Sequence, residues 1–215
     1  MSADCCSAKG DALAAMARTA ALRRVLLAVL AVNALLFIVE FGAGLVAGSA
    51  ALMADSVDML GDAMVYGISL YAIGRGVRWQ AGAALFKGAF ILALGLGVLV
   101  QIGVKIAYGV PPATTLMVAV GALALAGNLF CLRLLWRFRR DDVNMSSTFE
   151  CSRNDVIANI GVIAAAGGVA ITGAAWPDIL VASLIAMLFL RSAVRVGVEA
   201  SRAWRHAPRG TQAAS

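Results

Sequence analysis

Three carboxylates interrupt a part of the sequence that is otherwise almost entirely apolar. In ALMADSVDMLGDAMVYG, residues 51–67, they are Asp55, Asp58 and Asp62, separated by three and four positions. A helix with this spacing carries all three side chains on one face. Because neighbouring carboxylates repel one another in a low dielectric, they must either hold protons or bind a cation. The segment therefore predicts a helical face that can exchange protons for a cation.

A second motif, ECSRNDVIANIG, supplies further ligand types. Its Cys151 and Asp155 are four positions apart, as are Asp58 and Asp62. The two pairs together offer four ligands, the number that a tetrahedral divalent site requires. Thiols and carboxyls lose their protons when they bind a metal, so metal uptake releases protons. Three carboxylates and one thiolate suit Zn, Cd, Pb, Fe or Co better than Cu(I), and we favour Zn-like and Cd-like ions.

The elements that must position these residues are those of an integral membrane protein. Of the 215 residues, 61% are hydrophobic and 14% are charged, and the mean hydropathy is +0.87. Soluble domains average about 45–50% apolar and about 25% charged residues. A membrane-spanning helix needs about 20 apolar residues. We predict an all-α bundle of six transmembrane helices at residues 25–46, 51–73, 83–108, 114–136, 155–175 and 179–198.

Two helix starts bear on the ligands. Ser146, Ser147 and Thr148 precede the second motif and are N-cap candidates, which would let that helix begin near Phe149. Asp55 is interpreted as a cap at the start of its helix rather than as a ligand.

Basic residues predict the topology. The net charge of +6 would suggest a nucleic-acid partner in a soluble chain, but here Lys and Arg flank the hydrophobic runs, and we expect no nucleic acid. The connections at 48–49, 110–113 and 173–177 contain neither residue, so both termini are predicted to be cytoplasmic. We expect a multi-pass protein of the cytoplasmic membrane, with a cytoplasmic amino-terminal segment, a six-helix domain and a short cytoplasmic tail at residues 1–21, 22–200 and 201–215.

Other polar residues in or near the spans leave alternatives open. Glu40 is interpreted either as a supporting or proton-relay group or as the ion-pair partner of Lys105. Cys5 and Cys6 either capture a soft cation or have no function. Three amides are predicted to form hydrogen bonds between helices, with a ligand role kept open for the last of them: Asn33, Asn128 and Asn159.

The segments GSAALMADSVDMLGDAMVY, CSRNDVIANIGVI and WPDILVASLIAMLFLRSAVRV closely resemble the cation diffusion facilitators, a family of divalent-metal/proton antiporters. The resemblance covers about residues 24–199. In that family the second and fifth helices each carry a His/Asp-x-x-x-Asp pair. The resemblance implies that Asp58, Asp62 and Asp155 are ligands, and it puts Cys151 where His or Asp is usual. It also implies efflux of a metal that is a substrate rather than a cofactor, and a homodimer.

This sequence departs from the family pattern in two respects. The family commonly adds a cytoplasmic carboxy-terminal domain, whereas this chain stops shortly after the sixth helix, as expected of a short form. The only histidine is His206, so imidazole is absent from the predicted site.

Two other functions are kept as alternatives. The chain could be a non-transporting partner subunit of another facilitator, or a proton-coupled carrier of organic cations. An enzyme is not expected, because no nucleophile and base pair, phosphate-binding loop or cofactor motif occurs in the sequence.

Overall fold

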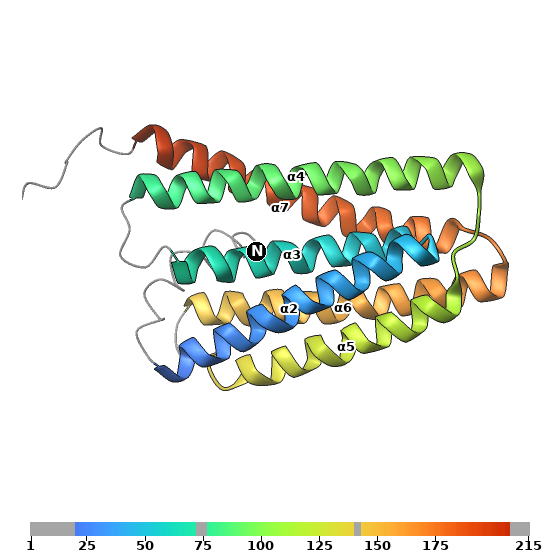
Figure 1. The fold of residues 1–215 in the computed structure, drawn as a ribbon, viewed down its shortest axis with the longest axis horizontal. Coiled ribbons are helices and arrows are strands. Elements are labelled where there is room, and N and C mark those ends of the chain that lie inside the picture. Colours follow the sequence, from blue (N-terminus) through green and yellow to red (C-terminus); the bar gives the residue numbers. More distant parts are fainter. Residues whose placement is uncertain (1–19, 72–76, 140–142, 207–215) are drawn as a thin grey trace, which may run out of the picture.

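The computed structural model describes residues 20–71, 77–139 and 143–206. These ranges form six α-helices and contain no strand, which confirms the predicted all-α class. The helices are α2 (Ala20–Ala47), α3 (Ala50–Tyr71), α4 (Val77–Tyr108), α5 (Thr114–Trp136), α6 (Val143–Thr172) and α7 (Trp176–His206) (Figure 1). Cys5 and Cys6 lie outside the described residues, as does most of the predicted amino-terminal segment.

The helices run along the long axis of one bundle, and α3 lies at its centre (Figure 1). α3 packs against α2, α4, α6 and α7, whereas α5 packs against α2 and α6. α4 and α7 pack along each other on one side of the bundle. The helix that carries the three aspartates is therefore the one with the most neighbours.

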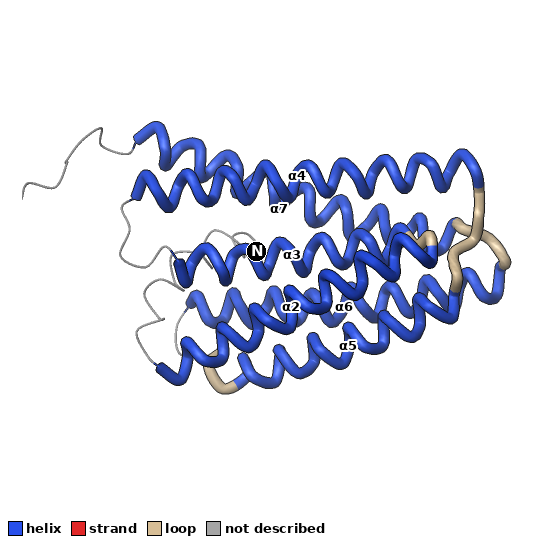
Figure 2. The backbone as a smooth tube through the Cα atoms, viewed as in Figure 1, coloured by secondary structure: helices blue, strands red, loops and turns tan. Residues whose placement is uncertain are grey.

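Three connections lie together at one end of the bundle (Figure 2). They are residues 48–49, 109–113 and 173–175, and we call this end the Asp178 end, after a residue at the start of α7. The connection that follows α5, which contains Arg137 and Arg139, lies at the opposite end. The three connections without Lys or Arg thus lie at one end of the bundle. This is expected if the basic connections face one side of the membrane and the others face the opposite side. The orientation of the bundle in the membrane stays a prediction.

Glycines with positive φ follow all three helices that end at the Asp178 end: Gly48, Gly109 and Gly173. Gly109 and Gly173 have φ values of 64° and 65°, a region that L side chains rarely adopt. The N–H of Gly109 donates to the carbonyl oxygen of Lys105, and that of Gly173 to Val169, each at 2.8 Å. These bonds close the last turn of α4 and of α6. The bond from Gly109 fixes the backbone of Lys105, whose side chain pairs with Asp178.

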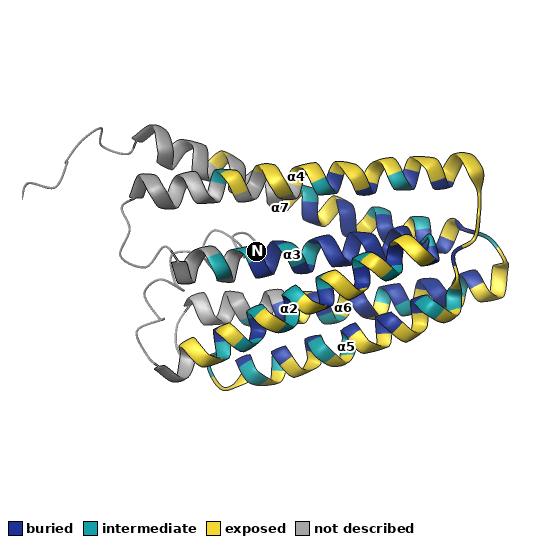
Figure 3. Ribbon diagram, viewed as in Figure 1, coloured by how far each residue is buried: buried dark blue, intermediate teal, exposed yellow. Residues whose placement is uncertain are grey.

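The bundle exposes large hydrophobic side chains and encloses an apolar core that also contains buried polar residues; Figure 3 shows the buried and exposed parts of the helices. Large hydrophobic side chains face outward, with exposed fractions of 88% at Ile171, 81% at Val46 and 71% at Leu188. The buried polar residues of the described chain include Asn33, Glu40, Asp55, Asp62, Lys105, Asn128, Asp155, Asn159 and Asp178. This distribution is the one expected of a bundle surrounded by lipid, where ionisable groups face the interior.

Within the described residues, three helical stretches are by themselves long and apolar enough to cross a membrane. They are Arg23–Ala47, Thr114–Trp136 and Ser152–Thr172. The aspartates of α3 lower its hydropathy, so a search by composition alone is expected to overlook it. Together with the apolar outer surface, these stretches identify a membrane protein.

The boundaries of α5 agree with the sequence prediction, α3 is described over Ala50–Tyr71 against the predicted 51–73, and α2, α4, α6 and α7 are longer than predicted. α6 begins at Val143 rather than near Phe149, so Ser146 lies inside the helix and the predicted N-cap at residues 146–148 is wrong. α7 continues to His206, into the predicted tail. Hydropathy marks only the part of a helix that lies in lipid, and polar turns can continue the same helix into water.

Candidate metal site

The three aspartates of α3 point to the interior of the bundle. Asp55 and Asp62 are buried, with exposed fractions of 1% and 6%, and Asp58 is partly buried. All three lie within the helix Ala50–Tyr71, whose Ala, Leu and Met residues favour helix formation. The predicted inward-facing stripe is therefore confirmed.

The second predicted pair lies on α6, which packs against α3. Asp155 is buried, with 5% of its surface exposed. Cys151 lies one turn earlier in the same helix, but its side chain is outside the described part of the structure. Asn159, one turn later, donates its Nδ2 to the carbonyl oxygen of Asp155 at 2.9 Å. The two helices that carry the ligand motifs are thus neighbours.

No group of three or more His, Cys, Asp and Glu side chains comes close enough to hold a metal ion among the described side chains. Asp58, Asp62 and Asp155 therefore do not form a three-ligand site by themselves in this arrangement. The side chain of Cys151, the fourth predicted ligand, lies outside the described part of the structure, so this finding does not include it. The complete ligand set stays a prediction.

Two further interior groups lie near these carboxylates. Glu40 of α2 is completely buried and lies within electrostatic range of Asp155 and Asp55. Cys131 of α5 is a buried free thiol within range of Asp155 and Asp62. Cys131 is a neighbour of the site that was not predicted from the sequence. Its spacing from the buried Asn128 and Leu135 on one face of α5 could have indicated that it points inward.

Asp55 is not a helix cap. α3 begins at Ala50, and Asp55 lies in its second turn, where its Oδ2 is buried and has no hydrogen-bond partner among the described residues. Ser49 occupies the cap position instead, and its Oγ accepts a hydrogen bond from the N–H of Leu52 at 3.2 Å. The cap prediction for Asp55 is therefore wrong, which removes the structural role that the sequence analysis gave it.

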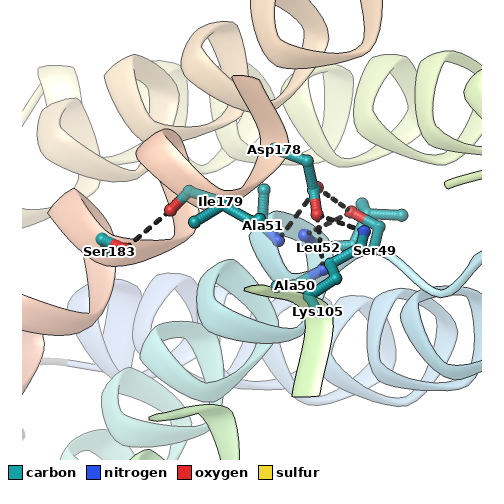
Figure 4. Close-up of polar contacts among 8 residues, drawn as sticks. All are labelled: Ser49, Ala50, Ala51, Leu52, Lys105, Asp178, Ile179 and Ser183. Carbon is teal, nitrogen blue, oxygen red and sulfur yellow. Dashed lines mark hydrogen bonds and ion pairs between the residues drawn. The ribbon is translucent and has the colours of Figure 1, made fainter. Parts of the chain in front are cut away.

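Asp178 of α7 completes the cap from a distant part of the chain (Figure 4). Its Oδ2 accepts from the N–H of Ala50 at 2.9 Å, and its Oδ1 accepts from the N–H of Ala51 at 3.2 Å. The Oγ of Ser49 donates to Oδ1 at 2.6 Å, and the Nζ of Lys105 donates to Oδ2 at 2.6 Å. We call Ser49, Lys105 and Asp178 the Asp178 cluster. It joins α3, α4 and α7 at one end of the bundle.

The Asp178 cluster settles one alternative for Glu40. Lys105 pairs with Asp178, so the interpretation of Lys105 as the partner of Glu40 is wrong. Neither carboxylate oxygen of Glu40 has a hydrogen-bond partner in the described part of the chain.

The hydrogen-bond partners of the buried amides also differ from the prediction. Asn33 donates to the carbonyl oxygen of Val29 at 2.9 Å, so both Asn33 and Asn159 bond within their own helices instead of between helices. The side-chain atoms of Asn128 have no partner in the described part of the chain. An amide without a partner on another helix readily donates to the backbone carbonyl four residues earlier in its own helix.

Residues 26–203 match the family described as "Cation efflux transmembrane domain". The chain is 27% identical over 173 residues to "Metal cation efflux system protein CzcD" of Cupriavidus metallidurans, covering 75% of this chain and 55% of that protein. It is 24% identical over 173 residues to "Cadmium, cobalt and zinc/H(+)-K(+) antiporter" of Bacillus subtilis, covering 74% and 56%. The chain thus spans about half the length of these relatives. The buried acids lie inside the matched region, and the chain belongs to the cation efflux family, the cation diffusion facilitators.

Proposed function

We propose that the chain exports a divalent transition-metal cation across a membrane in exchange for protons. The observation that carries this proposal is the burial of Asp62 and Asp155 on two packed helices inside a bundle with an apolar surface. A carboxylate at the centre of a membrane helix costs about 2.5–3.5 kcal/mol on insertion scales. Acids retained at this cost in a cation efflux domain are well explained as ligands of the exported ion.

The ion is bound by Asp58, Asp62, Cys151 and Asp155. The packing of α3 against α6 supports this assignment, since it brings the helices of the two pairs together. The described side chains form no three-ligand group. Complete coordination therefore uses Cys151, a small shift of α3 relative to α6, or both. Such a shift is what an alternating-access carrier undergoes in any case.

Protons are exchanged at the same atoms. The carboxylates and the thiolate bind metal only when deprotonated, so the ion and the protons exclude each other. Metal binding on one side releases protons there. Protonation from the other side weakens the ligands and releases the metal, which makes the proton gradient the driving force for export.

Zn, Cd and Co are the proposed substrates. A thiolate with carboxylates suits ions of intermediate softness, and the names of the relatives give cadmium, cobalt and zinc. Pb and Fe fit the ligand chemistry equally well, but those names do not include them. We further propose a homodimer in the cytoplasmic membrane with both termini cytoplasmic. The Lys-free and Arg-free connections at the Asp178 end support this orientation, and the family resemblance supports the dimer.

The test is transport by the purified full chain in proteoliposomes that contain a zinc-sensitive dye. An imposed pH gradient should drive Zn²⁺ uptake, and Asp155→Asn should abolish it. The matched control is Asn154→Ala, because Asn154 is the exposed neighbour of Asp155 on the same helix. Uptake by Asp155→Asn at the wild-type rate contradicts the proposal. Absence of Zn²⁺ uptake by the wild-type chain would point instead to a partner subunit or to a carrier of other cations.

A further inference from the structure

Glu40 is a buried carboxylate that the proposed transport site does not use. It lies in α2, has no exposed surface, and neither of its oxygens has a hydrogen-bond partner in the described part of the chain. An ionised carboxylate is expensive to bury unless a counter-ion or hydrogen bonds compensate it. Glu40 therefore needs a partner that is a proton or a cation.

Among the described residues, no buried base is free to pair with Glu40. Lys105 is the one base among the buried polar residues of the described chain, and its Nζ lies 2.6 Å from Asp178. The fully buried Asp178 also accepts three further hydrogen bonds, so it holds Lys105 at the end of the bundle. A proton or a mobile cation is therefore left as the partner of Glu40, and a second buried carboxylate within electrostatic range favours the cation.

Asp55 is a second unused buried carboxylate, and it lies within electrostatic range of Glu40. Its Oδ2 is buried and has no hydrogen-bond partner in the described part of the chain. Glu40 lies on α2 and Asp55 on α3; these helices pack against each other, and the two charges interact. Two neighbouring carboxylates in a low dielectric are stabilised strongly by a divalent ion between them.

The position of the pair suits a step on the transport path. At 1.5 Å per residue, Asp55 lies about 4–5 Å along α3 from Asp58 and about 7–8 Å from the helix start at Ala50. The pair therefore lies between the predicted ligands and the Asp178 end. Glu40 is also within electrostatic range of Asp155, so the two locations can influence each other.

We infer that Glu40 and Asp55 bind a second divalent cation, separate from the one bound by Asp58, Asp62, Cys151 and Asp155. Two carboxylates leave most coordination positions to water, so this ion is partly hydrated and held more weakly. The inference rests on the proposed function, because the second ion is another copy of the exported metal. Repulsion between the two ions favours release of the outer one, as in other multi-ion pathways.

The test is the number of Zn²⁺ ions bound per chain, measured by equilibrium dialysis of the purified full chain. Glu40→Gln and Asp55→Asn should each lose one ion relative to wild type. Asp155→Asn should lose the other, and Glu40→Gln with Asp155→Asn should lose two. Any Zn²⁺ bound by Cys5 and Cys6 is common to all variants and cancels in these differences. Ser56→Ala is the matched control, since Ser56 is buried next to Asp55 and its hydroxyl bonds its own helix at the carbonyl of Met53, 2.8 Å away.

The outcomes separate the two proposals. If Glu40→Gln and Asp55→Asn both keep the wild-type number of ions while Asp155→Asn loses one, the second site is overturned and the proposed function stands. If Asp155→Asn also keeps the wild-type number, the proposed ligand set fails. Two variants from different helices protect the test against a folding defect in one of them.

Discussion

The Nζ of Lys105 and the Oδ2 of Asp178 are 2.6 Å apart, with 6% and 0% of the two side chains exposed. This buried ion pair links the last turn of α4 to the first turn of α7. Asp178 also accepts hydrogen bonds from the first N–H groups of α3. The pair therefore fixes where α3 begins, and with it the depth of Asp55, Asp58 and Asp62 in the bundle.

The first prediction concerns the two halves of this pair. Asp178→Asn leaves Lys105 buried without its counter-ion, which typically costs about 3–5 kcal/mol. Lys105→Met should cost less, because Asp178 keeps Ser49 and the N-terminus of α3 as partners. Denaturant unfolding in detergent micelles measures both losses. Ser183→Ala is the control, since its hydroxyl bonds the carbonyl of Ile179 in the same helix. A larger loss in Lys105→Met than in Asp178→Asn would show that the helix terminus does not stabilise Asp178.

The second prediction uses two adjacent glycines of α6. A Cβ atom at Gly168 would lie 2.9 Å from the Cβ of Pro177, whereas one at Gly167 would meet nothing within 4 Å. Gly167→Ala should therefore stabilise the helix by about 0.5–1 kcal/mol. Gly168→Ala should destabilise the protein by about 1–3 kcal/mol, because the close contact between α6 and α7 must open. The comparison of melting temperatures tests this, and equal shifts in both variants would contradict the contact. The same contact shows that α6 and α7 approach each other closely at Gly168, whereas Gly167 has no such neighbour.

The third prediction concerns metal preference. Cys151→Asp replaces a soft ligand by a hard one, so binding of Cd²⁺ relative to Co²⁺ should fall by about tenfold, or about 1.4 kcal/mol. Competition between the two ions in equilibrium dialysis measures the ratio. Cys131→Ser is the control, because Cys131 is a buried thiol of α5 within electrostatic range of Asp62 and Asp155. A fall in Cys131→Ser and none in Cys151→Asp would transfer the thiol ligand from α6 to α5.

The burial of the interior acids could be predicted from the sequence. Asp62 and Asp155 could be placed inside the bundle because a carboxylate in an apolar run has few other places to go. The boundaries of α5 could be predicted because both ends coincide with changes in polarity.

The cap on α3 could not be predicted. It depends on Asp178, which is 128 positions from Ala50, and no local pattern indicates that α7 reaches the start of α3. The partner of Lys105 was missed for the same reason. Glu40 and Asp178 are both buried acids, and only the packing of α4 against α7 decides which of them receives the cation.

The last prediction is the number of protons released when Zn²⁺ binds. A cysteine thiol is mostly protonated near neutral pH, whereas an ordinary carboxyl has already lost its proton. If Cys151 binds Zn²⁺ as a thiolate, the wild-type chain should release about one proton more per ion than Cys151→Ser. Calorimetric titration in two buffers with different ionisation enthalpies gives this number. Cys131→Ser should release as many protons as wild type. Because metal binding releases protons, Zn²⁺ affinity must fall as the pH falls, and this sign is the one that lets protons entering from the far side expel the metal. An unchanged proton count in Cys151→Ser would remove the thiol from the site and leave carboxylates alone to couple metal to protons.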